Sequence, residues 1–147
     1  MNSDPPHGYR GYIGSRPIFG QRTAQHVQNL VIRDYADRNG LIYRLSATEY
    51  AMPGCFMQLR LVLDELPRLE GVIAFSLFML PSRPERRAEI FAEILSLGRH
   101  IHFALEGMAV RDSRDADLAE DVWRLYLATR NMTAAKARRR LLPEHAG

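Results

Sequence analysis

Ten consecutive residues in the middle of the chain, Gly71–Leu80, are apolar except for Ser76. A strand of this composition is typical of the centre of a parallel sheet, where helices cover both faces. Segments with the spacing of strands and helices alternate on either side of it. Such alternation predicts βαβ units with right-handed crossovers, so we expect an α/β fold.

Apolar spacing and helix-ending residues define the expected elements. Strands are predicted at Tyr9–Ser15, Leu41–Thr48, Gly71–Leu80 and His100–Leu105. Helices are predicted from an N-cap at Thr23 to Gly40, over Cys55–Leu66, from Pro84 to Gly98 and over Asp117–Thr129. Together they predict a single three-layer domain, with a four-stranded, mainly parallel sheet in the order 2-1-3-4 flanked by helices.

Two helices have apolar stripes that we expect to face the sheet. The stripe of the first consists of Val27, Leu30, Val31 and Tyr35, and that of the third consists of Ala88, Phe91, Ile94 and Leu95. Residues 1–7 are predicted to be a flexible N-terminus, residues 8–132 the α/β domain, and residues 133–147 a frayed basic tail.

Composition excludes several classes of protein. The chain has no run of about 18 apolar residues and no signal peptide, so we expect a cytoplasmic protein without a membrane partner. Cys55 is the only cysteine, which excludes an internal disulfide and a cysteine-based zinc site. Lys136 is the only lysine and no Gly-x-x-x-x-Gly-Lys loop occurs, so we expect neither a lysine-bound cofactor nor a P-loop, and we predict no cofactor.

Polar residues gather where the predicted strands end. In open α/β sheets ligands bind outside the carboxyl ends of the strands, where the strand order reverses, here between the first and third strands. A Gly/Ser/Arg loop that opens a helix supplies amides and guanidinium groups for an anion. The predicted ligand-binding residues are Arg10, Gly14, Arg16, Gln21, Arg22, Ser46 and Ser76. Surface arginines and structural serines are the competing interpretation.

Three residues are candidates for catalysis at this edge. Glu49 lies near apolar neighbours that would raise its pKa, which suits a general acid or base. It would equally suit an N-cap or first-turn acid of the Cys55 helix. Glu106 ends the fourth strand and is either a second acid or the partner of Arg10 or Arg16. Ser15 is a candidate nucleophile, although no base lies near it in the sequence, which favours a structural turn serine.

A metal site and a reactive cysteine are weaker hypotheses. His100 and His102 alternate along one strand and share a face, which is half of a metal site without an assured third ligand. We therefore predict no metal. Cys55 follows Pro53 and Gly54 at a helix start, where a thiol pKa would fall, but a small buried residue explains it as well.

Several phrases together resemble the sporadic carbohydrate cluster family. They are Gly8–Arg16, Gln25–Tyr35, Leu45–Tyr50 and Ser76–Pro81. The likeness covers residues 8–130. As the family name suggests, these small bacterial proteins are encoded among genes for surface polysaccharide and sugar biosynthesis. The resemblance implies a role in making or modifying a carbohydrate and supplies no catalytic residue.

A second likeness is to the catalytic domain of serine recombinases. It rests on Gly11–Ser15, the helix that follows and Gly71–Leu95, and it implies a resolvase- or flavodoxin-like fold. Such enzymes need a nucleophilic serine served by several arginines and an Asp-Arg pair that ends the third strand. That pair falls near the apolar Phe78 and Met79, Ser15 is displaced by one residue, and no DNA-binding domain follows. We expect the fold without strand exchange.

The chain is therefore expected to act in bacterial surface-carbohydrate biosynthesis. It would bind an anionic sugar, sugar phosphate or nucleotide sugar, and transform it by metal-independent acid–base chemistry. One alternative is a non-catalytic scaffold or regulator of a carbohydrate-pathway enzyme, with Phe19, Phe56 and Met79 exposed for contact.

The remaining alternatives concern the C-terminal part of the chain. A degenerate recombinase-like protein could bind nucleic acid through the tail from Lys136, but the tail lacks interleaved aromatic residues, so nucleic acid is not the expected partner. Trp123, Leu125 and Tyr126 would suit either a homodimer or the core.

Overall fold

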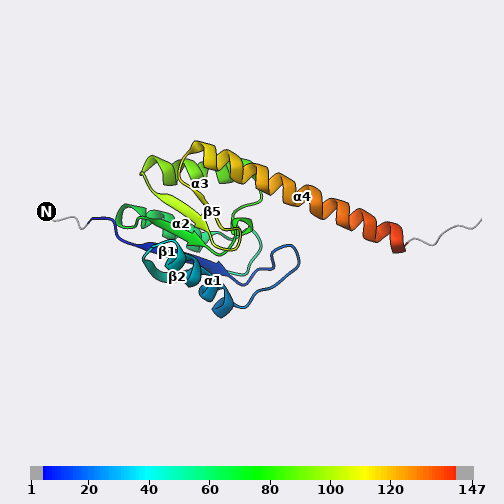
Figure 1. Cartoon of the computed structure of the whole chain (residues 1–147), viewed down its shortest axis with the longest axis horizontal. Coiled ribbons are helices and arrows are strands. Elements are labelled where there is room, and N and C mark those ends of the chain that lie inside the picture. Colours follow the sequence, from blue (N-terminus) through cyan, green and yellow to red (C-terminus); the bar gives the residue numbers. More distant parts are fainter. Residues whose placement is uncertain (1–4, 142–147) are drawn as a thin grey trace, which may run out of the picture.

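The computed structural model describes residues 5–141, and its elements alternate between strand and helix through most of the chain (Figure 1). The strands are β1 (Tyr9–Gly14), β2 (Tyr43–Glu49), β3 (Gly71–Ala74), β4 (His100–Phe103) and β5 (Met108–Val110). The helices are α1 (Gln25–Arg38), α2 (Met57–Asp64), α3 (Pro84–Ser96) and α4 (Ser113–Leu141), with two short 3₁₀ helices, η1 (Leu66–Arg68) and η2 (Leu77–Met79).

The strands form one sheet in the order β2-β1-β3-β4-β5. The first four are parallel, and their order confirms the predicted 2-1-3-4 arrangement. The predicted number of four strands is wrong, because β5 pairs antiparallel with β4 at the edge. Gly107, with a φ of +65°, lies in the tight turn before β5, a conformation that favours glycine. Three residues are too few to give a period-two pattern in the sequence.

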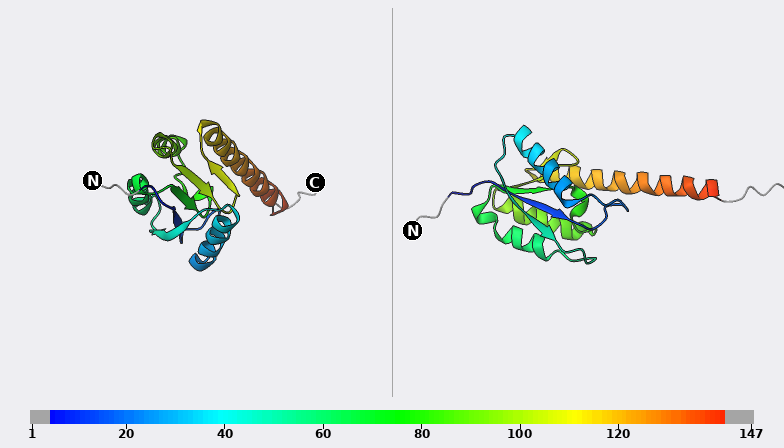
Figure 2. Two further views of the ribbon diagram at one scale, coloured as in Figure 1. Left: turned by 60° about the vertical axis from the view of Figure 1, so that its left-hand side comes forward. Right: turned by 90° about the horizontal axis from the view of Figure 1, so that it is seen from below.

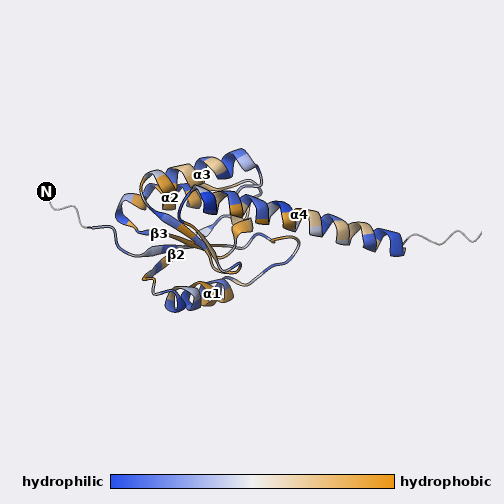
Figure 3. Cartoon of the chain, turned by 45° about the horizontal axis from the view of Figure 1, so that its top comes forward, coloured by the Kyte–Doolittle hydropathy of each residue, from blue (hydrophilic) through white to orange (hydrophobic). Residues whose placement is uncertain are grey.

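Helices cover both faces of the sheet, which makes the three predicted layers (Figures 2 and 3). Helix α1 lies on one face, and α2 and α3 lie on the other. The predicted stripe of α1 is displaced around the helix: its buried residues are Gln28, Ile32, Tyr35 and Ala36, while Val27 and Leu30 are exposed. In α3 Phe91 and Ile94 of the predicted stripe are buried, together with Arg87 and Ile90, whereas Ala88 is exposed and Leu95 is half-buried.

The central apolar run is only partly a strand. β3 ends at Ala74, and the chain then turns into η2. Ser76 causes this turn, because its side chain accepts a hydrogen bond from the backbone N–H of Phe78 and so caps η2. The predicted strand to Leu80 is therefore too long, although all but one of its residues are buried.

Helix α4 is much longer than predicted and projects beyond the sheet (Figures 1 and 2). Residues 133–141 continue the helix, so the predicted boundary after residue 132 falls inside α4, and the expected fraying is wrong up to Leu141. The rest of the predicted tail, and residues 1–4 of the predicted flexible N-terminus, lie outside the described residues. From residue 5 to 141, no helix is both long and apolar enough to span a membrane.

Candidate functional site

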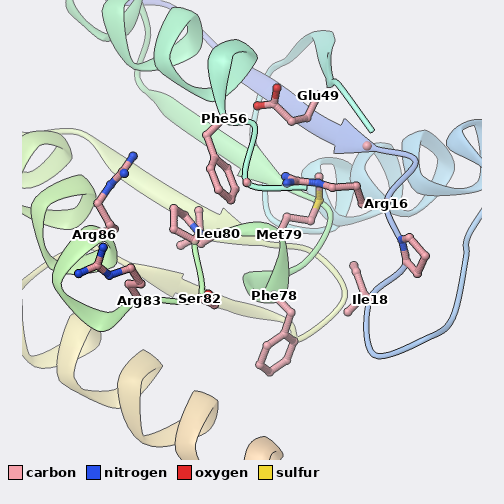
Figure 4. Close-up of a pocket in the computed structure, with 14 residues that line it drawn as sticks. Arg16, Ile18, Glu49, Phe56, Phe78, Met79, Leu80, Ser82, Arg83 and Arg86 are labelled. Atoms are coloured by element: carbon pink, nitrogen blue, oxygen red, sulfur yellow. The ribbon is translucent and has the colours of Figure 1, made fainter. Parts of the chain in front are cut away.

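A cavity of about 380 Å³ lies at the carboxyl ends of β1 and β3, where the strand order reverses (Figure 4). Its apolar lining comes from the loops after these strands and from the start of α2, and consists of Pro17, Ile18, Phe56, Phe78, Met79, Leu80 and Pro81. Its charged lining consists of Arg16, Arg83, Arg86 and Glu49. A largely apolar hollow with a few charged groups is the usual form of a small-molecule site.

Glu49 is buried at this cavity and is held by the protein itself. Its Oε2 accepts from Tyr12 Oη at 2.8 Å and from the N–H of Leu59 at 2.9 Å, and its Oε1 accepts from the N–H groups of Tyr50 and Gln58 at 3.1 Å. A carboxylate has about four acceptor positions, so these donors occupy them all. Glu49 thus caps the N-terminus of α2 from the end of β2, although it is neither the N-cap residue, which is Phe56, nor a residue of the first turn.

The expected rise in the pKa of Glu49 is wrong. Burial by itself would raise the pKa, but the hydrogen bonds from Leu59, Gln58, Tyr12 and Tyr50 stabilise the carboxylate and bring it below the ordinary value. Glu49 is therefore ionised at neutral pH. Its charge is shared among fixed donors, which does not suit a general acid.

Gln28 fixes the base of the β1–α1 loop, and sequence reasoning missed it. Its Oε1 accepts from the N–H of Gly14 at 3.1 Å, while its Nε2 donates to the C=O of Gly14 at 2.6 Å and of Thr23 at 2.8 Å. Both backbone groups of Gly14 are therefore occupied. Thr23 is not the N-cap of α1; that position is Ala24, without a side-chain cap. The sequence signal for a buried Gln28 was its position one helical turn before Ile32, which is also buried.

The β1–α1 loop folds back on itself and packs against α4. Ile18 and Gln21 pair through both backbone groups around Phe19 and Gly20, which both have positive φ. The Phe19 ring lies 4.7 Å from that of Phe78 and 6.4 Å from that of Tyr126. Phe19 and Phe56 are half-buried and Met79 is buried, so the expectation of exposed contact residues here is wrong.

Arg83 and Arg86 line the cavity but were not among the predicted ligand-binding residues. Arg83 is the N-cap of α3 and Arg86 lies in its first turn, and both are exposed. Within the described residues, Arg16, Arg83 and Arg86 form no ion pair. Cations at a helix N-terminus are unfavourable, so the free arginines of α3 would be stabilised by an anion. The sequence signal was an arginine pair flanking Pro84 after the central strand.

Arg87 positions the loop that carries Arg83. Its side chain is 2% exposed and donates to Glu120 of α4 through Nε and Nη2, and to the C=O groups of Pro81 and Ser82 through Nη1. The guanidinium carbon lies 3.8 Å from the centre of the Trp123 ring. Arg87 therefore ties the cavity wall at residues 81–82 to α4.

The structure brings only some of the predicted ligand-binding residues to the cavity. Gly14 and Arg16 line it, and the Arg16 guanidinium lies 4.6 Å from the centre of the Phe56 ring. Gln21 and Arg22 are exposed residues of the same loop that do not line it. Ser15 is half-buried, does not line the cavity and, within the described residues, makes no hydrogen bond to a base.

Arg10 and Ser46 lie elsewhere. Arg10 belongs to the amino end of β1, and its Nε is 3.8 Å from Glu65. Ser46 Oγ donates to Asn29 Oδ1 at 2.6 Å, which ties β2 to α1. Neither side chain lines the cavity.

Ser76 and Glu106 form a pair of their own. Ser76 Oγ donates to Glu106 Oε2 at 3.0 Å, and the N–H of Leu77 donates to Oε1. The expected ion pair of Glu106 with Arg10 or Arg16 is therefore wrong. Burial raises the pKa of Glu106, and the bonds from Leu77 and Ser76 oppose that rise. Neither residue lines the cavity, so this carboxylate braces the end of β4 against η2.

His102 faces α1 from the middle of the sheet. Its Nδ1 lies 2.7 Å from Tyr35 Oη, and its ring packs edge-on against Tyr9. Burial lowers the pKa of His102 to about 4, with smaller contributions from Arg111 and His100. Between residues 5 and 141, no three His, Cys, Asp or Glu side chains cluster as a metal ion would require.

Comparison with known proteins supports the fold. No protein-family model and no curated protein matches the chain. A solved structure of a resolvase family site-specific recombinase from Streptococcus pneumoniae is similar to it, with a TM-score of 0.58 and 12% sequence identity. The match covers 90% of this chain and 99% of the recombinase chain. The chain therefore adopts a resolvase-like α/β fold.

Proposed function

We propose that the protein binds an anionic sugar derivative, such as a sugar phosphate or nucleotide sugar, in cytoplasmic surface-carbohydrate biosynthesis. The single observation that carries the proposal is the gathering of Arg16, Arg83 and Arg86, none in an ion pair within residues 5–141, around one cavity at the strand ends. Arginine forks match phosphate and carboxylate oxygens. The carbohydrate part of the proposal rests on the sequence resemblance given above.

The geometry supports binding more directly than catalysis. Glu49 is the only carboxylate among the residues that line the cavity, and its acceptor positions are occupied by other donors. Acid–base chemistry on the sugar stays a prediction. Strand exchange is not proposed, because Phe78 and Met79 lie near the positions expected for the Asp-Arg pair and, among residues 5–141, Ser15 makes no hydrogen bond to a base.

Binding is tested by calorimetric titration with glucose 1-phosphate and UDP-glucose. The double variant Arg83→Ala/Arg86→Ala should weaken binding by about tenfold or more, because it loses charge-assisted hydrogen bonds. Arg22→Ala is the matched control: it removes the same charge from the same loop as Arg16, outside the cavity. Absence of binding to the wild-type protein, or equal loss in the control, would contradict the proposal.

We also propose that α4 joins two copies of the chain. Leu118, Leu125 and Met132 recur every seven residues and are more than half exposed, so they form one apolar stripe along the helix. Of the residues expected at a dimer contact, Trp123 is buried against Arg87 and is not available. Leu125 and Tyr126 remain exposed. Apolar stripes on long helices are typical of contacts between helices.

A further inference from the structure

The arginines of the cavity form two separate groups (Figure 4). Arg83 and Arg86 lie together at the start of α3, and Arg16 lies on the opposite side, beyond Leu80 and Met79. The surface between the two groups is apolar and includes Phe56. One compact anion, such as inorganic phosphate, would therefore contact one group and leave the other empty.

Arg16 is held in place before any ligand arrives. Its guanidinium carbon lies 4.6 Å from the centre of the Phe56 ring, a cation–π contact that restricts the side chain. Phe56 itself is fixed because it precedes α2, whose first amides are bound by Glu49. A planar guanidinium that is fixed in this way suits a carboxylate, because the two carboxylate oxygens can accept two parallel N–H donors of the arginine.

Arg83 and Arg86 form the more strongly charged group. Both are exposed at the N-terminus of α3, where no side chain caps the helix. Two adjacent guanidinium groups match the double charge of a phosphate ester better than the single charge of a carboxylate. With three arginines and one carboxylate, the lining has a formal charge of two positive, which calls for a ligand with at least two negative charges.

Building on the proposed function, we infer that the ligand is a sugar phosphate with a second acidic group on the sugar. Arg83 and Arg86 would bind the phosphate, the carbon skeleton would lie over Leu80, Met79 and Phe56, and Arg16 would bind the sugar carboxylate. Hexuronic acid 1-phosphates carry both groups on one ring, with the phosphate on C1 and the carboxylate attached to C5. The cavity volume of about 380 Å³ lies within the range of small-molecule sites.

Titration calorimetry with two matched probes tests the inference. Glucuronic acid 1-phosphate should bind the full-length protein about tenfold more tightly than glucose 1-phosphate, which differs only in having a hydroxymethyl group in place of the carboxylate. Arg16→Ala should abolish this ratio and leave the affinity for glucose 1-phosphate unchanged. Arg83→Ala/Arg86→Ala should weaken both ligands alike, and Arg22→Ala should change neither.

The outcomes separate the inference from the proposed function. If both sugars bind with equal affinity, or Arg16→Ala weakens both by the same factor, the inferred role of Arg16 in binding a second acidic group is wrong and the proposed function stands. If no sugar phosphate or nucleotide sugar binds, both are wrong. All of the substituted arginines are exposed or half-exposed, so the variants should fold, and unchanged melting temperatures of the ligand-free proteins would confirm it.

Discussion

Tyr12 donates its phenolic hydrogen to Glu49 Oε2 over 2.8 Å, and this bond connects the middle of β1 to the residue that caps α2. Both side chains are buried, and Glu49 raises the pKa of Tyr12 in addition to the larger effect of burial. The contact places the carboxylate at the cavity wall as a structural group. It also fixes the start of α2, and therefore Phe56 beneath Arg16.

Glu49→Gln should destabilise the protein by about 1–3 kcal/mol. The amide NH₂ of glutamine cannot accept a hydrogen bond, so it would face a buried donor that now bonds to the carboxylate. Urea unfolding measures the change, and Glu89→Gln, on the exposed surface of α3, is the control with no comparable loss. The lowered pKa of Glu49 means that its contribution is present above its ordinary pKa and is lost as the pH falls through the folded-state value. Equal stability of both variants would contradict the structural role.

His102 should make the protein less stable as the pH falls from 6.5 to about 4. In this window the unfolded chain binds a proton at the histidine, while the pKa of His102 in the folded chain is lowered to about 4 and the ring stays neutral. The loss amounts to roughly 3 kcal/mol at most, at about 1.4 kcal/mol for each unit of pKa. His102→Asn keeps a polar partner for Tyr35 and should remove this loss of stability at low pH.

The comparison is made by unfolding in urea at several pH values. His26→Gln provides the control, because His26 is exposed on α1 and its replacement should leave the pH profile as it is in the wild-type protein. A wild-type profile that is flat between these pH values would show that His102 takes up its proton as readily in the folded chain as in the unfolded one.

Arg87→Ala should destabilise the protein by on the order of 3–5 kcal/mol, because it leaves Glu120 and two backbone carbonyls without their buried partner. Arg86→Ala, one residue earlier and exposed, should cost less than about 0.5 kcal/mol. Thermal unfolding distinguishes the two. Similar melting temperatures for both variants would mean that Arg87 does not tie the 81–82 loop to α4.

Leu125→Asp should shift the protein from dimer to monomer, because it places a charge in the middle of the stripe on α4. Light scattering coupled to gel filtration measures the mass directly. Leu30→Asp, at an equally exposed leucine of α1, should leave the mass of the dimer unchanged. A monomeric wild-type protein would contradict the proposed contact.

Much of the fold could be predicted from the sequence, because apolar spacing reports burial. The order of the first four strands follows from the alternation of elements and the handedness of crossovers, and it is confirmed. The buried faces of α1 and α3 could be assigned only in part from apolar residues, which correctly identified Tyr35, Phe91 and Ile94. Gln28 and Arg87 take buried positions through hydrogen bonds that only the folded chain supplies.

The candidate site was predicted at the correct edge of the sheet but with an incomplete set of residues. Arg16 lines the cavity, whereas Arg22, which follows the turn at Phe19 and Gly20, is exposed and does not line it. Arg83 and Arg86 come from a third element, and their proximity to Arg16 depends on tertiary structure. The environment of Glu49 likewise depends on α2, whose amides outweigh the effect of burial on its pKa.

The most direct test of the central claim is a titration of the ¹⁵N-labelled protein with glucose 1-phosphate, followed by amide chemical shifts. The cavity predicts progressive shifts at Gly54, Ser82 and Arg83, with little change at His7 and Arg44, which line other hollows at the amino end of the sheet. Shifts confined to His7 and Arg44, or no shifts at all, would contradict an anion-binding site at the strand ends.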